Sequence, residues 1–328
     1  MRAAITGATG LVGSNLAVLL CEQGVEVRCT HRRSSRRDHL DGLPLRWLEA
    51  ELNDVDALAR AFDDVDVVYH CAASVEMRRH PTSAQRQANL DGTRNVLAAA
   101  RRSGARRLVH CSSVVTCAIA EGEADVTEED RWNFPAHGLD DGYAVTKRES
   151  EELVRDAAAE LDVVVVNPGF MIGPYDPKPS SGRLVLAVLD GRLFFYTEGY
   201  NNFVDVRDVC RGMTLAAERG RRGERYILGG ENLRFQEAFA RIAAVVGKRP
   251  PRFGMPKALG LLGGWLGELG QAVLRRELDV NLVTARYGYC RGYRFSSAKA
   301  ERELGYSHGP LEDAVRDALA WFRARGMA

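Results

Sequence analysis

The stretch TGATGLVGSNL, residues 6–16, carries three glycines spaced three apart. It connects a short apolar run (3–6), typical of a strand, to an apolar helical pattern (11–23). In such a turn the first glycine permits a tight bend, the second lets the backbone approach a pyrophosphate, and the third lets the helix pack against the sheet. The free N–H groups at the helix start favour phosphate, so a dinucleotide site is predicted over a purely structural turn. The residues of this turn predicted to contact the cofactor are Gly7, Thr9, Gly10, Leu11, Val12 and Gly13.

The first half of the chain continues to alternate apolar runs with helical patterns. Runs such as VVVV lack the polar alternation of a half-exposed strand, as expected for parallel strands that are buried on both faces. The pattern therefore predicts an α/β fold with a Rossmann-type, doubly wound parallel sheet. The further predicted strands are 25–30, 45–50, 65–72, 107–113 and 162–168, and the further helices are 54–63, 83–103 and 141–160.

The pattern loosens after residue 168. Residues 167–183 are rich in Pro, Gly and Ser and predict a loop. We expect residues 1–168 to form the dinucleotide-binding domain and residues 169–328 to form mainly a smaller substrate-binding lobe, with some segments returning to the first domain. Short strands are predicted in the lobe at 203–206 and 225–228.

Composition excludes several classes of protein. The net charge of +1 gives no reason to expect a nucleic-acid partner. Seven cysteines, an odd number without a CxxC pair, argue against a disulfide framework or a metal site and favour a reducing cytoplasm. The chain opens on a strand, so no signal peptide is expected. Residues 258–274 are apolar but short and contain Glu268, so we expect a buried helix rather than a membrane-spanning one, with contact to a membrane surface as the alternative.

The end of the second predicted strand, RCTHRRSSRR, bears on the choice of dinucleotide. An acidic residue usually holds the ribose 2′-OH of NAD at this point, but here His31 takes that place. Arg32 and Arg33 can instead bind a 2′-phosphate in forked geometry. NADP(H) is therefore predicted as the preferred cofactor, with NAD(H) possible. The alternative, a solvated basic loop, suits Arg36 and Arg37.

The stretch YAVTK (143–147) places Tyr143 and Lys147 four residues apart, on one face of a predicted helix. The strand before it ends in Ser112 and Ser113, at the sheet edge where ligands bind. A nearby ammonium lowers the pKa of a phenol, which can then exchange a proton with a substrate oxygen while a serine hydroxyl binds the same oxygen. Successive residues of a strand face opposite ways, so only one serine can serve, and the spacing does not say which.

These motifs together resemble the extended short-chain dehydrogenase/reductase family over nearly the whole chain, and within it the branch of dihydroflavonol 4-reductases and 3β-hydroxysteroid dehydrogenases. The resemblance implies Ser113, Tyr143 and Lys147 as the catalytic residues. It also implies that VVYHCAA (67–73) lies along the cofactor and that ANLDGTRNVL (88–97) supplies a structural or proton-relay asparagine. The cofactor contacts implied in this way, besides Tyr143 and Lys147, are Leu52, Cys71, Ala72, Ala73, Asn89, Pro168 and Phe170.

One departure from the family's nucleotide-sugar epimerases bears on the substrate. Those enzymes commonly carry an arginine and an aspartate where this chain has Asn201 and Asn202, although Arg183 or Arg192 could still meet a phosphate. The aromatic stretch 192–203 suits an apolar or planar substrate. We therefore expect an NADPH-dependent reductase of a bulky, partly apolar ketone. The alternatives are a nucleotide-sugar epimerase or dehydratase and a non-catalytic NADP-binding regulator.

Three further expectations complete the interpretation. His70 and His110 lie on central predicted strands, where core packing is favoured over ligand binding. The acidic stretch 121–130 predicts a solvated loop. Members of the family occur as monomers or as homodimers that pair through helices equivalent to 83–103 and 141–160.

Overall fold

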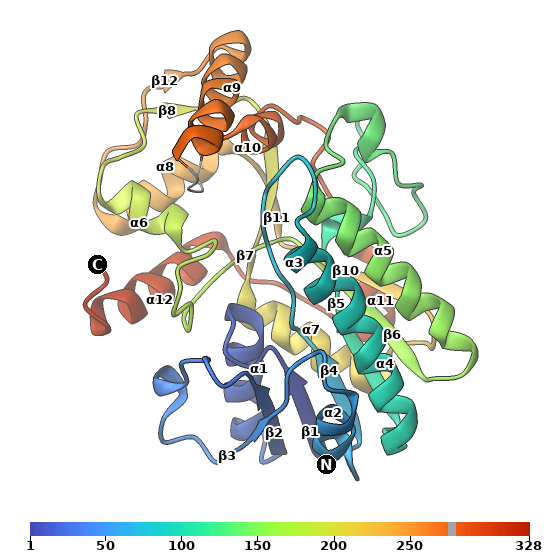
Figure 1. Cartoon of the computed structure of the whole chain (residues 1–328). Coiled ribbons are helices and arrows are strands. Elements are labelled where there is room, and N and C mark those ends of the chain that lie inside the picture. Colours follow the sequence, from blue (N-terminus) through green and yellow to red (C-terminus); the bar gives the residue numbers. More distant parts are fainter. Residues whose placement is uncertain (275–279) are drawn as a thin grey trace.

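The computed structural model describes residues 1–274 and 280–328, and the side chains of all of these except residues 271–274. Seven parallel strands form one sheet in the order β10-β6-β5-β4-β1-β2-β3 (Figure 1). The chain moves outward from β1 in both directions, which confirms the predicted doubly wound α/β fold. The strands are β1 (Arg2–Thr6), β2 (Glu26–His31), β3 (Leu45–Glu49), β4 (Val67–His70), β5 (Arg107–Cys111), β6 (Val163–Pro168) and β10 (Arg225–Leu228).

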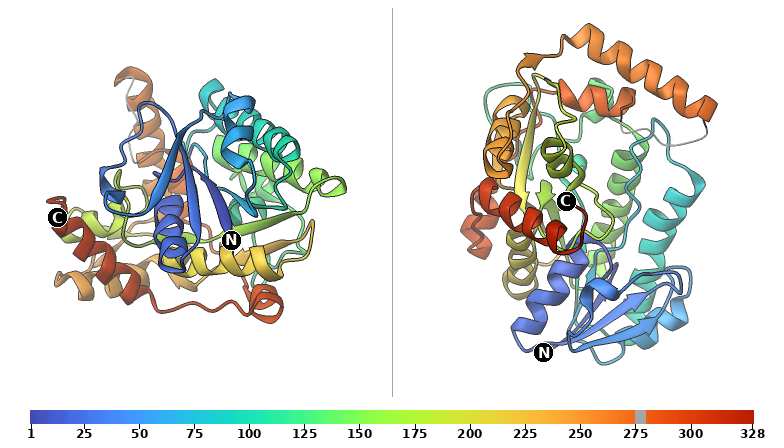
Figure 2. Two further views of the ribbon diagram at one scale, coloured as in Figure 1. Left: turned by 90° about the horizontal axis from the view of Figure 1, so that it is seen from below. Right: turned by 90° about the vertical axis from the view of Figure 1, so that its left-hand side faces the viewer.

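Helices cover both faces of this sheet (Figure 2). The valines of β6 explain why: Val164 and Val166 pack into one apolar core, Val163 and Val165 into another, and all four are fully buried. A strand with two buried faces gains stability from both layers, which is why its sequence does not alternate. The helices on one face are α1 (Leu11–Glu22), α7 (Val206–Arg219) and α11 (Ala298–Leu304), and those on the other are α2 (Val55–Phe62), α4 (Gly92–Ser103) and α5 (Gly142–Asp156).

A second, smaller lobe stands over the carboxyl edge of the sheet (Figure 1). Its strands form two small sheets, in the orders β11-β9-β7 and β12-β8. The prediction of a loop throughout 167–183 is wrong at Phe170–Ile172, because this apolar triplet pairs with β9. The elements of the lobe are β7 (Phe170–Ile172), α6 (Arg183–Leu189), β8 (Phe195–Tyr196), β9 (Tyr200–Asp205), β11 (Glu231–Arg234), α8 (Phe235–Val246), β12 (Phe253–Gly254), α9 (Lys257–Leu274), α10 (Leu282–Gly288) and α12 (Leu311–Ala324).

Two stretches of the first half differ in detail from their predictions. The helix predicted at 83–103 consists of α3 (Ser83–Arg86), a π-helical turn at Gln87–Asp91, and α4. Within the acidic stretch 121–130, Glu128 is buried and its Oε1 accepts a hydrogen bond of 2.8 Å from the Ile227 N–H. Part of this stretch therefore belongs to the core rather than to a solvated loop.

The two central histidines are core residues, as predicted. His70 and His110 are each 1% exposed, and their rings lie 5.2 Å apart. The Nδ1 of His70 is hydrogen-bonded to Thr6 Oγ1 at 2.7 Å and its Nε2 to Thr93 Oγ1 at 3.1 Å. Burial lowers the pKa of His70 to about 3, so its ring is neutral at physiological pH.

The apolar stretch near the end of the chain does form a helix, α9, but the prediction that it is buried is wrong. Its outward residues Leu259, Leu262, Trp265, Leu266 and Leu269 are 52–57% exposed. No helix among the described residues is long and apolar enough to cross a membrane.

Candidate active site

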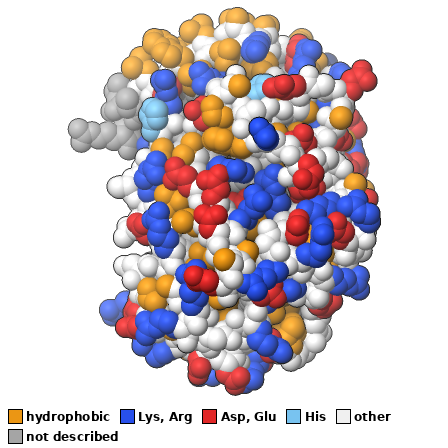
Figure 3. All heavy atoms as spheres, turned by 90° about the vertical axis from the view of Figure 1, so that its right-hand side faces the viewer, with side chains coloured by type: hydrophobic (Ala, Val, Ile, Leu, Met, Phe, Trp, Pro, Cys, Tyr) orange, Lys and Arg blue, Asp and Glu red, His pale blue; other side chains and the backbone are white. Residues whose placement is uncertain are grey.

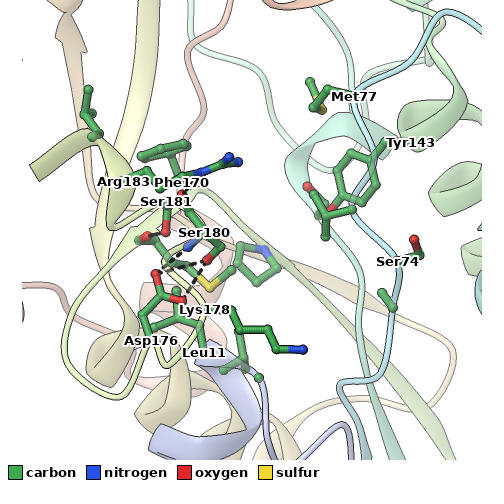
Figure 4. Close-up of a pocket in the computed structure, with 18 of the residues that line it drawn as sticks. Leu11, Ser74, Met77, Tyr143, Phe170, Asp176, Lys178, Ser180, Ser181 and Arg183 are labelled. Carbon is green, nitrogen blue, oxygen red and sulfur yellow. Dashed lines mark hydrogen bonds between the residues drawn. The ribbon is translucent and has the colours of Figure 1, made fainter. Parts of the chain in front are cut away.

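A cavity of about 1620 Å³ lies between the carboxyl edge of the large sheet and the lobe. Ligand pockets commonly measure about 300–1,000 Å³, so there is room here for a dinucleotide together with a second molecule. Figure 4 shows Tyr143 on one side of this space and Phe170, Asp176 and Arg183 across it. Tyr143 precedes β6 in the chain, whereas Phe170, Asp176 and Arg183 follow it.

The glycine turn forms one end of the cavity. Gly7 has a φ of +73°, and a Cβ on it would lie 2.6 Å from Ala72 N. A Cβ on Gly13 would lie 2.2 Å from the Gly7 carbonyl oxygen, whereas one on Gly10 would meet nothing closer than 3.5 Å. The first and third glycines thus allow the tight turn, and the second faces open space, as a pyrophosphate requires. All six residues predicted in this turn line the cavity: Gly7, Thr9, Gly10, Leu11, Val12 and Gly13.

The loop after β2 only partly matches its prediction. His31 and Arg32 line the cavity, but Arg33 does not, because a turn in which Ser35 N donates to the Arg32 carbonyl leaves Arg33 exposed. Arg36, predicted to be solvated, lines the cavity and pairs with Asp38 at 3.2 Å. Arg36 could not be predicted, because the spacing of residues in an irregular loop does not show which side chains point toward a ligand.

Most of the cofactor contacts implied by the family resemblance lie on the cavity wall, but Asn89 does not. Its Oδ1 accepts a hydrogen bond of 2.7 Å from Ser74 N, and its Nδ2 donates one of 3.0 Å to Thr146 Oγ1. Asn89 thus joins the chain after β4 to helix α5 from a buried position. The residues that do line the cavity are Leu52, Cys71, Ala72, Ala73, Pro168 and Phe170.

The two serines after β5 have different surroundings. Ser113 has an extended backbone, so its side chain and that of Ser112 point in opposite directions. Ser112 Oγ is buried and donates a 2.6 Å hydrogen bond to Glu151 Oε2. Both serines line the cavity, but it is the Ser113 side chain that lies close enough to the phenol of Tyr143 to lower its pKa. Of the two, Ser113 is the serine beside Tyr143.

Lys147 lines the cavity and is almost fully buried. Its Nζ donates a 2.8 Å hydrogen bond to the Cys111 carbonyl. Burial lowers the pKa of Lys147, while the charge of Glu151 acts in the opposite direction. Glu151 was not predicted as part of the site, yet it follows Tyr143 and Lys147 at steps of four on the same helix face. Its place on the helix face that carries Tyr143 and Lys147 could have indicated that Glu151 belongs to the site.

The environment of Tyr143 corrects one expectation. Burial raises the pKa of Tyr143 above its ordinary value, and the hydrogen bond with Ser113 offsets only part of this. The predicted depression by Lys147 is not among the main influences on the phenol. The phenol is therefore protonated at neutral pH, the state in which it can give a proton to a substrate oxygen.

Asp141 holds the start of the helix that carries Tyr143. Its Oδ1 accepts hydrogen bonds from the N–H groups of Tyr143 (2.9 Å) and Ala144 (3.2 Å), and its Oδ2 accepts one of 2.8 Å from the hydroxyl of Tyr287 on α10. Burial raises the pKa of Asp141 to about 6. Sequence reasoning missed this residue, although an aspartate directly before a helix is a common cap.

The lobe side of the cavity combines aromatic and apolar side chains with a polar group that includes Asp176 and Lys178. Asn202 is fully buried and bonds to the chain at Gly230, whereas Asn201 lines the cavity. Arg183 also lines the cavity, but Arg192 pairs with Asp190 at 2.7 Å and does not. Aromatic and apolar residues of the lobe that line the cavity are Phe195, Tyr200, Phe235, Met255, Leu259, Tyr289 and Tyr293.

A glycine turn on a parallel sheet, with a hydroxyl pair and a buried lysine beside it, defines a nicotinamide-dependent oxidoreductase of the Rossmann type. Comparison with known proteins gives the family. The model of the NAD-dependent epimerase/dehydratase family matches residues 3–229, and the chain belongs to that family. It is an NAD(P)-dependent oxidoreductase.

The chain is similar to individual members along its whole length. A putative dihydroflavonol 4-reductase from Synechocystis is 35% identical, with 98% of this chain and 94% of the relative covered. Sterol demethylase protein B from Methylococcus capsulatus is 34% identical, with both chains fully covered. The crystal structure of a nucleoside-diphosphate-sugar epimerase from Pseudomonas aeruginosa superimposes with a TM-score of 0.81 at 27% identity, covering 100% of this chain and 99% of that one.

Proposed function

We propose that the protein is an NADPH-dependent reductase of a bulky, partly apolar ketone. The observation that carries the proposal is the group of aromatic side chains of the lobe, including Phe195, Tyr200 and Tyr293, that lines the same cavity as Ser113 and Tyr143. Such a wall stabilises a flat hydrophobic molecule by removing its surface from water. Two relatives carry the names dihydroflavonol 4-reductase and sterol demethylase, which refer to compounds with several rings.

The chain's own residues have distinct parts in the proposed reduction. When bound, the nicotinamide cofactor supplies the hydride. Ser113 donates a hydrogen bond to the ketone oxygen, and Tyr143 gives that oxygen its phenolic proton as negative charge develops there. The raised pKa of Tyr143 keeps this proton in place until then. Lys147, one helical turn from Tyr143 on the cavity wall, is held by the Cys111 carbonyl and would bind the ribose of the nicotinamide.

The preference for NADPH rests on the loop after β2. Arg32 and Arg36 bring guanidinium groups to the cavity where the adenosine ribose would lie, and His31 replaces the usual acid. Asp38, the first acid in that loop, is paired with Arg36. Guanidinium groups favour a 2′-phosphate over a 2′-hydroxyl by charge-assisted hydrogen bonds.

A second candidate is a nucleotide-sugar epimerase, favoured by one observation. Arg183 lines the cavity on the lobe side, where it could meet a diphosphate. The similar structure from Pseudomonas aeruginosa is named as a nucleoside-diphosphate-sugar epimerase. Against this candidate, Asn202 is committed to a buried backbone contact and Arg192 to Asp190.

The test separates the two candidates by cofactor and by substrate. The purified protein is denatured to identify released nucleotide, and the stripped protein is titrated with NADPH and with NADH. Binding of NADPH at least about tenfold tighter, with NADPH oxidation on addition of polycyclic ketones, supports the reductase. Tightly retained NAD, with thermal protection by a nucleotide sugar but by no ketone, would favour the epimerase instead.

A further inference from the structure

Among the described residues, most of the large hydrophobic side chains that are strongly exposed lie in one region. They belong to α9, to the short strands β8 and β12 and to the residues next to these elements, and Figure 3 shows hydrophobic side chains gathered along the top of the molecule, where α9 lies. Phe194 is 69% exposed, Phe253 66% and Trp265 53%. Exposed apolar patches of this kind usually mark interaction surfaces.

Helix α9 has two faces of opposite character. Leu262, Leu266 and Leu269 recur at helical spacing on the outer face, with Trp265 beside them. On the inner face the helix packs closely through glycines: a Cβ on Gly264 would lie 2.8 Å from Ala285, and one on Gly267 2.0 Å from the Val280 carbonyl oxygen. The glycines that looked like helix breakers thus attach α9 to α10 and leave the leucines facing outward.

The apolar face is continuous with the mouth of the active-site cavity. Leu259 is 57% exposed and also lines the cavity, and so do Phe195 and Val280. A molecule that entered the cavity past these residues would move from an apolar surface directly into an apolar pocket. Water-soluble substrates do not need such an entrance.

The segment that leads into α9 is basic. Residues 248–270 contain four basic side chains and a single acidic one, Glu268, and the basic ones are all exposed: Lys248, Arg249, Arg252 and Lys257. Apolar side chains on one helix face with adjacent positive charges are typical of helices that lie in the interface of an anionic membrane. A second copy of this chain on the same face would bring two basic segments together and cover the cavity mouth.

We propose that the outer face of α9, with Phe194 and Phe253, docks on an anionic phospholipid bilayer and lets a lipid-dissolved substrate enter the cavity. The entry of substrate rests on the proposed ketone reductase, whereas the docking itself does not. The helix lies on the bilayer and does not cross it, in keeping with its length and its glycine-packed inner face.

Docking is tested by sedimenting the full chain with vesicles of phosphatidylcholine alone and with phosphatidylglycerol added. We expect binding to the anionic vesicles, weakened at least about tenfold by Leu262→Gln/Leu266→Gln, because two apolar side chains are lost from the interface. Lys248→Gln/Arg249→Gln/Arg252→Gln should weaken binding more than the charge-matched control Arg94→Gln/Arg102→Gln/Arg316→Gln, whose residues lie elsewhere. A blue shift of tryptophan fluorescence on binding should be absent in Trp265→Phe.

Two results would overturn the proposal. One is that the protein binds neither the phosphatidylcholine vesicles nor those that contain phosphatidylglycerol. The other is a stable dimer in solution that Leu262→Gln/Leu266→Gln dissociates, which would assign the face to a second copy. Failure of the reductase is distinguishable, because a protein that binds vesicles but reduces no ketone, in buffer or in detergent, keeps the docking surface and loses only the proposed function.

Discussion

Two sets of three glycines lie on opposite sides of the cavity and serve different ends. Gly7, Gly10 and Gly13 shape a loop, and the middle one leaves room for a ligand. Gly260, Gly264 and Gly267 lie on one face of α9, where a Cβ on each would come within 2.0–2.8 Å of the segment carrying α10. The first set admits a cofactor, and the second attaches a helix.

The comparison teaches that glycine spacing alone does not reveal its use. The first set follows a strand and opens a helix, a context that predicts phosphate binding. The second lies within an apolar stretch, where glycine ordinarily weakens a helix. Only the packing against α10 explains why it is tolerated there. The glycines on the sheet side therefore leave room for the cofactor, whereas those on the lobe side hold α9 against its neighbours.

The largest expected effect is on the catalytic step, which depends on neither of the two glycine sets. Tyr143→Phe removes the proton donor and should lower kcat about a thousandfold, within the range for general acid catalysis. The affinity for NADPH should change by less than about twofold, since the ring and the fold are retained. Steady-state kinetics with a reducible ketone and a fluorescence titration measure the two quantities. Retention of full activity would remove Tyr143 from the mechanism.

Next in size is the loss of the cofactor turn. Gly13→Ala places a Cβ 2.2 Å from the Gly7 carbonyl oxygen. We expect the free energy of unfolding to fall by about 3 kcal/mol, as in overpacked cores, and NADPH binding to weaken at least about tenfold. Gly122→Ala is the control, because nothing lies within 4 Å of a Cβ there. Urea unfolding and NADPH titration check both, and equal behaviour of the two variants would contradict the close approach.

Asp141, which joins the two sides of the cavity through Tyr287, should make stability depend on pH. Its pKa rises from 3.8 to about 6 in the folded state, so the folded protein holds the proton more tightly than the unfolded one. Stability from this group is fully present below about pH 4 and is lost as pH rises to about 6, by about 3 kcal/mol.

Asp141→Asn keeps a helix-capping oxygen and removes this titration. Its stability relative to the native chain should therefore rise between pH 4 and pH 7. Urea midpoints across that range test the expectation, with Asp140→Asn, an exposed neighbour, as the control. Identical pH profiles of the native chain and Asp141→Asn would show that the carboxyl titrates normally.

The second glycine set gives a smaller and more local effect. Gly267→Ala places a Cβ 2.0 Å from the Val280 carbonyl oxygen and should shift α9, raising KM for a bulky ketone several-fold at a cost of about 2 kcal/mol in stability. The affinity for NADPH should not change. Gly263→Ala, on the same helix but with nothing within 4 Å of a Cβ, should leave the stability unaltered. A loss of NADPH binding in Gly267→Ala would erase the distinction between the two glycine sets.

The smallest effect concerns the loop after β2. Arg32→Ala should weaken NADPH binding about tenfold, or about 1.4 kcal/mol, and leave NADH binding unchanged, because only the former carries the 2′-phosphate. Arg33→Ala is the matched control, since Arg33 does not line the cavity. Each of the two variants is titrated with NADPH and with NADH. An equal loss of affinity for both cofactors in Arg32→Ala would speak against a 2′-phosphate site.

The sequence by itself determined the parallel sheet, the glycine turn and the Tyr143–Lys147 helix. These features depend on residues that are close together in the sequence. Consecutive valines indicate a strand buried on both faces, and a four-residue step places two side chains on one helix face. The membership of the family followed from the same patterns and is confirmed by the family match.

Only the tertiary structure decided the rest, because each question concerned residues far apart in the chain. Glu151 takes up Ser112 and leaves Ser113 beside Tyr143. Arg33 turns outward while Arg36 reaches the cavity. The short strand at 170–172 exists because β9 is there to pair with it. The exposure of α9 follows from glycine contacts with a helix that begins later in the chain, and hydrophobicity alone could not assign its leucines to the outside.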